Sequence, residues 1–137
     1  MRMRATAAAI ALVAALSTTA CAQTVCPAIG YLHTLAVEVA DDRVASIELC
    51  DTDGCSSSEA AASPDSTGAF AHAAPEPDGA GRWLAGGLLD APERVTVRML
   101  DESGALLGEA EVEPAWQRTG GSEQCGGPHA ATIDVAP

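Results

Sequence analysis

Short stretches in which apolar and polar residues alternate run through most of this chain. Such alternation sends successive side chains to opposite faces and predicts half-buried β-strands. In residues 31–39, Leu35 and Val37 fall on one face, while Thr34 and Glu38 fall on the other. No long stretch of the sequence shows the apolar period of an amphipathic helix. The pattern therefore predicts an all-β domain.

Three further stretches predict strands. Residues 44–50 follow the turn-forming pair Asp41-Asp42, so we expect them to form a hairpin with residues 31–39. Residues 94–100 and 130–135 alternate in the same way. The residues expected to face inward are Ala45, Ile47, Leu49, Val95, Val97, Met99, Ala131, Ile133 and Val135.

Residues 101–104, Asp-Glu-Ser-Gly, predict the loop of a second hairpin, in which residues 94–100 pair with the stretch that follows. A slip of one residue in this pairing would place Glu109 opposite Val97 and bury a charge, so the sequence specifies the register. The pairs expected from a four-residue loop are Leu100–Ala105, Met99–Leu106, Val97–Gly108, Val95–Ala110, Thr96–Glu109 and Arg94–Glu111.

Residues 56–81 differ from the rest of the chain. They are rich in Ser, Ala, Pro, Asp and Gly and contain the only Phe, Phe70. We expect a long mobile connection that holds one short edge strand near Phe70. Short strands separated by turns are typical of packed sheets. The expected fold is an immunoglobulin-like two-sheet sandwich of about seven strands, formed as a single domain by residues 23–137.

The start of the chain has the features of an export signal. Arg2 and Arg4 give it positive charge, and residues 5–16 form an uncharged apolar run. This run is too short for a membrane-spanning helix, which needs roughly twenty apolar residues. It fits the apolar region of a secretion signal, with small residues after it. We therefore predict a signal peptide over residues 1–22 and an extracytoplasmic mature protein.

Two processing sites compete at the end of this signal. Residues 18–21, Thr-Thr-Ala-Cys, fit a permissive lipobox, in which Cys21 is lipidated and becomes the new N-terminus. Residues 20–22, Ala-Cys-Ala, fit ordinary cleavage after Ala22. The first alternative, which we favour, anchors the protein to the outer face of the cell membrane through its acyl chains. The second alternative secretes it freely, and under both Cys21 no longer takes part in disulfide pairing.

The four remaining cysteines indicate two disulfides, for which three pairings are possible. Cys50 and Cys55 bracket the turn-forming residues Asp-Thr-Asp-Gly, which favours a bond between them. This leaves Cys26 to pair with Cys125. The alternative is a four-thiolate zinc site, but the paired C-x2-C spacing of such sites is absent from the sequence. We expect disulfides and no metal.

The charge of the mature chain excludes one class of partner. From Gln23 onward there are five Arg, no Lys and nineteen acidic residues, a net charge of −14. A surface of this charge repels the phosphates of nucleic acids. Nucleic acid is therefore not an expected partner.

Candidate catalytic residues are few. The three histidines, His33, His72 and His129, stand in no metal-binding or protease motif, and no G-x-S-x-G sequence is present. His33 lies on an apolar strand face, which favours a packed histidine over a ligand. We expect no catalytic residues and no cofactor.

Two other features have a structural and a functional interpretation. Asp51 and Asp53 before Gly54 resemble half of a calcium loop, but the Gly comes two positions early and a third Asp is missing. A tight disulfide-closed turn is the favoured interpretation, and weak calcium binding is the alternative. We also expect Trp83 and Trp116 to anchor the core rather than to serve as ligand platforms.

Three motifs carry a resemblance to a known group of proteins. They are residues 26–31 (Cys-Pro-Ala-Ile-Gly-Tyr), residues 49–51 (Leu-Cys-Asp) with Cys55, and residues 125–128 (Cys-Gly-Gly-Pro). The chain resembles small exported proteins of high-GC actinobacteria, many of which are described as lipoproteins. The resemblance covers most of residues 21–137. It implies export and an anchor, but no activity and no catalytic residues.

Together these features favour a non-enzymatic protein of the cell envelope that binds or spaces something at the cell surface, with a protein or a glycan as its partner. One alternative is an accessory subunit of a membrane complex, with the acidic surface as its docking face. Another is an envelope hydrolase whose site assembles from residues scattered in the sequence. The fold does not choose among these functions.

Overall fold

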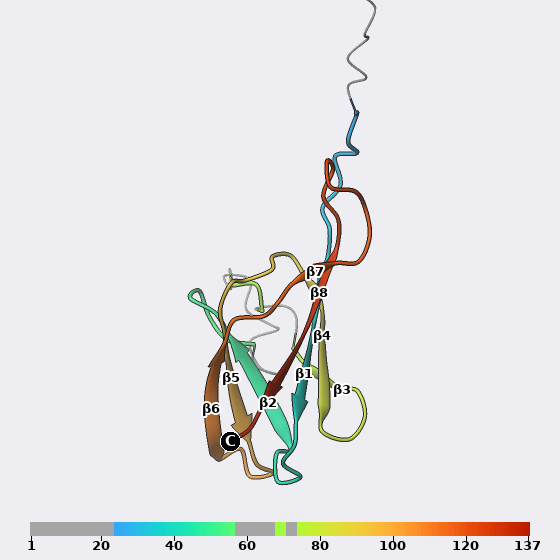
Figure 1. Cartoon of the computed structure of the whole chain (residues 1–137). Helices are drawn as coiled ribbons and strands as arrows, with labels where there is room; N and C mark the ends of the chain where they lie inside the picture. The colour runs from blue at the N-terminus through green and yellow to red at the C-terminus, as the bar shows by residue number, and fades with distance from the viewer. Residues whose placement is uncertain (1–23, 57–67, 71–73) are drawn as a thin grey trace, which may run out of the picture.

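The computed structural model describes residues 24–56, 68–70 and 74–137. These residues form eight strands in two packed sheets and contain no helix (Figure 1). The all-β, two-sheet sandwich expected from the sequence is confirmed. The predicted signal peptide, including Cys21, lies outside the described residues.

The larger sheet has five strands in the order β3-β4-β1-β8-β7. Its central strand, β1, runs antiparallel to β4 and parallel to β8, so that Val37 has Trp83 on one side and Ile133 on the other. The strands of this sheet are β1 (His33–Val39), β3 (Glu76–Pro77), β4 (Arg82–Leu88), β7 (Gln117–Arg118) and β8 (His129–Val135).

The smaller sheet has three antiparallel strands in the order β2-β5-β6. Its strands are β2 (Ser46–Cys50), β5 (Val95–Leu100) and β6 (Leu106–Val112). The inner faces of the two sheets meet in one core. The predicted inward faces of β2, β5 and β8 are confirmed for eight of the nine residues expected to face inward, which are buried. Ala45 is exposed instead, because it precedes β2, which begins at Ser46.

The hairpin predicted between residues 31–39 and 44–50 is wrong, because β1 and β2 belong to different sheets. The chain crosses from one sheet to the other between them. Val44 is buried in the core on the way, and the N–H of Ala45 already donates to the carbonyl of Leu100 in the second sheet, at 2.8 Å. Alternation shows which face of a strand is buried, but not which strand lies beside it.

The predicted hairpin of β5 and β6 is present, but its register differs by two residues over most of its length. Val97 lies opposite Ala110 rather than Gly108, and Arg98 lies opposite Glu109. The loop is one residue longer than expected, and an irregularity between Met99 and Leu100 adds the second residue of the shift. A shift of two residues keeps side chains on their predicted face, so no charge becomes buried. Leu106 is the exception: it was expected inward opposite Met99, but it lies opposite Leu100, where the shift is a single residue, and is 50% exposed, while Leu107 packs against the core.

Residues 56–81 contain more fixed structure than a loop implies. Ser56 and Phe70 are buried, and the Ser56 hydroxyl accepts a hydrogen bond from the Leu49 N–H at 2.9 Å. The short edge strand of this segment is β3, which begins six residues after Phe70. Phe70 itself lies in a turn, from which its side chain packs into the core. Residues 57–67 and 71–73 lie outside the described residues, so the mobility of this connection stays a prediction.

Candidate functional site

An extension projects beyond the sandwich at the end where the chain enters it (Figure 1). It consists of residues 24–32 and 119–128, which run side by side, and we call it the N-terminal extension. The disulfide between Cys26 and Cys125 joins its two parts, with a Cα–Cα distance of 5.2 Å. The predicted pairing of these cysteines is thus present, and it links residues 99 positions apart.

The second part of the extension is a tight turn that requires glycine. The N–H of Ser122 donates to the Gly126 carbonyl at 2.9 Å. Gly121 and Gly126 have φ values of 71° and 74°, which side chains rarely allow, and a Cβ on Gly121 would overlap the Gly126 carbonyl. The extension is therefore held by local geometry as well as by its disulfide.

A cluster of three rings lies at the base of the extension. The His33 ring centroid is 5.2 Å from that of His129 and 6.2 Å from that of Trp116. The His33 Nδ1 accepts a hydrogen bond from the His129 N–H at 3.0 Å. Burial, and then the neighbouring His129, lower the pKa of His33, which favours the neutral ring that this hydrogen bond requires. His33 is a packed residue, and its Nδ1 is occupied by a main-chain donor.

The two tryptophans hold the core to different extents. Trp83 is buried in the core on β4, opposite Val37 of the central strand, as predicted. Trp116 is half-buried against the core, and its indole Nε1 donates to the Pro92 carbonyl at 2.9 Å. Trp116 also lines a shallow surface groove between Pro92 and Pro114, with Glu93 and Glu113 at its edge. His72, the remaining histidine of the sequence, lies outside the described residues.

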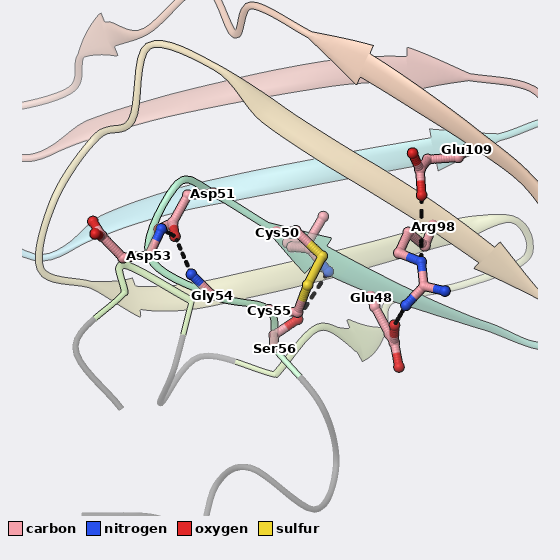
Figure 2. The surroundings of a disulfide bond; sticks show 10 residues. Glu48, Cys50, Asp51, Asp53, Gly54, Cys55, Ser56, Arg98 and Glu109 are labelled. Atoms are coloured by element: carbon pink, nitrogen blue, oxygen red, sulfur yellow. Dashed lines mark hydrogen bonds and ion pairs between the residues drawn. A yellow bond between two sulfur atoms is a disulfide. The ribbon is translucent and has the colours of Figure 1, made fainter. Parts of the chain in front are cut away.

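The predicted disulfide between Cys50 and Cys55 closes the turn after β2 (Figure 2). Inside this turn, Asp51 Oδ1 accepts hydrogen bonds from the N–H groups of Asp53 and Gly54, at 2.8 and 3.0 Å. Its Oδ2 accepts from the Ala69 N–H at 2.8 Å. Both oxygens of the Asp51 carboxylate thus accept hydrogen bonds from the main chain.

This arrangement agrees with the disulfide-closed turn and gives no support to calcium binding. Figure 2 shows the Asp53 carboxylate directed away from that of Asp51, so the two do not converge on a common ligand position. Among the described residues, no three His, Cys, Asp or Glu side chains gather into a possible metal site.

Ion pairs cross the outer face of the smaller sheet. Arg98 lies between Glu48, at 2.8 Å, and Glu109, at 3.4 Å, so it joins all three strands (Figure 2). Arg94 contacts Glu111 at 3.4 Å, the ion pair predicted from the sequence, although the two residues are diagonal rather than direct neighbours. These ion pairs link the strands of the smaller sheet, and most of the acidic residues in the described part of the chain lie outside any ion pair.

A further ion pair lies in the turn after β1. The Arg43 side chain donates to the Asp41 carboxylate through Nε, at 3.0 Å. This hydrogen bond and the Arg43 N–H hold the pKa of Asp41 at about 2. Asp41 therefore stays charged over the whole range in which most proteins are stable.

Comparisons of this chain with family models, curated proteins and solved structures gave no match. Within the described part of the chain, no helix is long and apolar enough to cross a membrane. The candidate functional features therefore come from the sequence and structure of this chain alone. They are the disulfide-linked N-terminal extension and Cys21, the cysteine of the predicted lipobox, which precedes it in the sequence.

Proposed function

We propose that this protein is a lipid-anchored, non-enzymatic β-sandwich module of the cell envelope. In this proposal, acyl chains on Cys21 hold it at the outer face of the membrane, where it binds or spaces a protein or glycan partner. The observation that carries the proposal is the pairing of cysteines. Four of the five form two disulfides, as is usual in oxidising extracytoplasmic compartments, and the one left over is the lipobox Cys21.

The surroundings of the chemically versatile residues support a binding or spacing role. His33 Nδ1 and the Asp51 carboxylate accept main-chain hydrogen bonds, so both are engaged in holding the fold. The net charge of −14 keeps the mature chain soluble and away from other anionic surfaces. The half-buried Trp116, in its groove between two prolines, offers an aromatic contact for a partner.

The anchor is tested by expressing the wild type and Cys21→Ser in a bacterial host that processes lipoproteins. We expect the wild type in the membrane fraction, with the mass of a diacylated N-terminal cysteine, and the variant without this mass. Thr24→Ser is the matched control, because it changes a nearby hydroxyl residue outside both cleavage patterns and should keep the lipid. A wild-type N-terminus at Gln23 would refute the proposed anchor.

A further inference from the structure

Exposed apolar side chains gather at one end of the molecule. Of the five large exposed hydrophobic residues in the described chain, Val25, Ile29 and Leu32 lie in the N-terminal extension, with exposed fractions of 89%, 60% and 55%. Leu89, exposed by 70%, lies at its base, because the preceding Leu88 pairs with His33. Single exposed apolar residues are common, but a group at one end indicates an interaction surface.

The extension itself is nearly free of charge, and the nearest acidic residue at its base is Asp90, which directly follows Leu89. Residues 24–32 contain no charged side chain, and residues 119–128 contain only Glu123. The opposite end holds the acidic turns after β1 and between β5 and β6, with Asp41, Asp42, Asp101 and Glu102 (Figure 1). In a strongly acidic protein, the extension is thus the region that anionic lipid headgroups repel least.

The extension also directly follows the proposed anchor. Val25 is four residues from Cys21, and four residues span at most about 14 Å. Acyl chains on Cys21 would therefore bring Val25 to the headgroup layer. If the extension stood perpendicular to the membrane, only its start near Val25 would reach the headgroups. Ile29, Leu32 and Leu89 would then stay in water.

We propose that the N-terminal extension lies against the membrane, with Val25, Ile29, Leu32 and Leu89 in contact with the interfacial layer of the bilayer. The inference rests on the proposed lipidation of Cys21 and adds a second, non-covalent contact to it. Such contacts matter because burial of apolar area strengthens the interfacial binding of a lipidated protein. The Cys26–Cys125 disulfide and the glycine turn fix the shape of the extension, so this contact also sets the orientation of the sandwich.

A tryptophan placed in the extension tests this contact. The mature protein is purified from membranes and reconstituted into phosphatidylcholine vesicles with ordinary or brominated acyl chains, as the wild type, Ile29→Trp and Leu106→Trp. Leu106 is the matched control, because its side chain is 50% exposed and lies at the opposite end of the molecule (Figure 1). Leu89→Trp provides a second position if Ile29→Trp disturbs folding.

We expect the tryptophan at position 29 or 89 to emit at shorter wavelength in vesicles and to lose emission with brominated lipid, after subtraction of the wild-type signal. The tryptophan at position 106 should show neither change. Equal emission in the two lipids would overturn the inference, and a blue shift without quenching would identify a second copy of this chain as the occupant. The mass spectrum of the same sample separates the two proposals, since a missing acyl group overturns the anchor and the membrane contact together.

Discussion

At the residue scale, the carboxylate of Asp51 organises the chain after β2. It accepts three main-chain hydrogen bonds, two from its own turn and one from Ala69 in the segment that carries the buried Phe70. Hydrogen bonds from N–H groups to a carboxylate are stronger than those between neutral groups. One side chain therefore connects the disulfide-closed turn to a residue that fills the core.

We predict that Asp51→Ala lowers the free energy of unfolding by about 1–3 kcal/mol, because it leaves three N–H groups without their acceptor. Urea unfolding of the oxidised protein measures this. Asp53→Ala is the control and should change stability by no more than about 0.5 kcal/mol, because its carboxylate points away from the turn. Equal losses in the two variants would contradict the role assigned to Asp51.

At the scale of the element, the sequence predicts strands and their faces better than their partners. The period of two identifies the buried face of β2, β5 and β8 because burial acts on each side chain separately. It leaves two questions open. It does not reveal that β1 and β2 separate into different sheets, and it does not distinguish registers that differ by two residues, such as Val97 opposite Gly108 or Ala110.

Strand β4 shows another limit of the pattern. Its sequence ends in Ala85-Gly86-Gly87-Leu88, in which two glycines remove the apolar signal, and it was not among the predicted strands. Its position depends on contacts that lie far away in the sequence, above all the pairing of Trp83 with Val37 of the central strand. The sequence does not reveal the exposed apolar residues of the extension for a related reason. Composition indicates that a residue is apolar, but only the fold shows that it stays in water.

The core of the smaller sheet gives a test at this scale. Val97 is fully buried and lies between Leu49 and Ala110, so Val97→Asp would place a carboxylate among apolar side chains. A buried unpaired charge costs several kcal/mol, comparable to the whole stability of a small domain. We predict that the variant does not fold, as judged by circular dichroism and thermal melting.

Ser46→Asp is the control for this substitution, since it adds the same charge at an exposed position of the neighbouring strand β2. It should melt within a few degrees of the wild type. A Val97→Asp protein with the native melting temperature would refute the placement of this side chain.

At the scale of the whole molecule, the two disulfides constrain the chain to different degrees. Cys50–Cys55 joins residues five positions apart, whereas Cys26–Cys125 joins residues 99 positions apart. A cross-link stabilises mainly by restricting the unfolded chain, so the longer loop contributes more. The sequence predicts both pairings. The turn residues between Cys50 and Cys55 favour a bond between these two, and Cys26 and Cys125 are then left to pair with each other.

We predict that Cys26→Ala with Cys125→Ala lowers the free energy of unfolding by about 4–5 kcal/mol, and that Cys50→Ala with Cys55→Ala lowers it by about 2 kcal/mol from loop closure. Guanidinium unfolding of the two double variants beside the wild type measures both. If the Cys50/Cys55 variant lost more free energy of unfolding than the Cys26/Cys125 variant, the disulfide of the extension would not stabilise the sandwich as predicted.

The parallel pairing of β1 with β8 has a consequence for the time at which the protein folds. The first strand of the domain lies at the centre of its sheet, and its parallel neighbour β8 begins at His129, far from β1 in the sequence. A polypeptide threaded through a narrow channel from its N-terminus would offer β1 no parallel partner until residues 129–135 had also passed. Contacts so distant in sequence form slowly. If the chain is exported as proposed, it would stay open during transit and acquire its structure outside the cytoplasm, where its cysteines can also be oxidised.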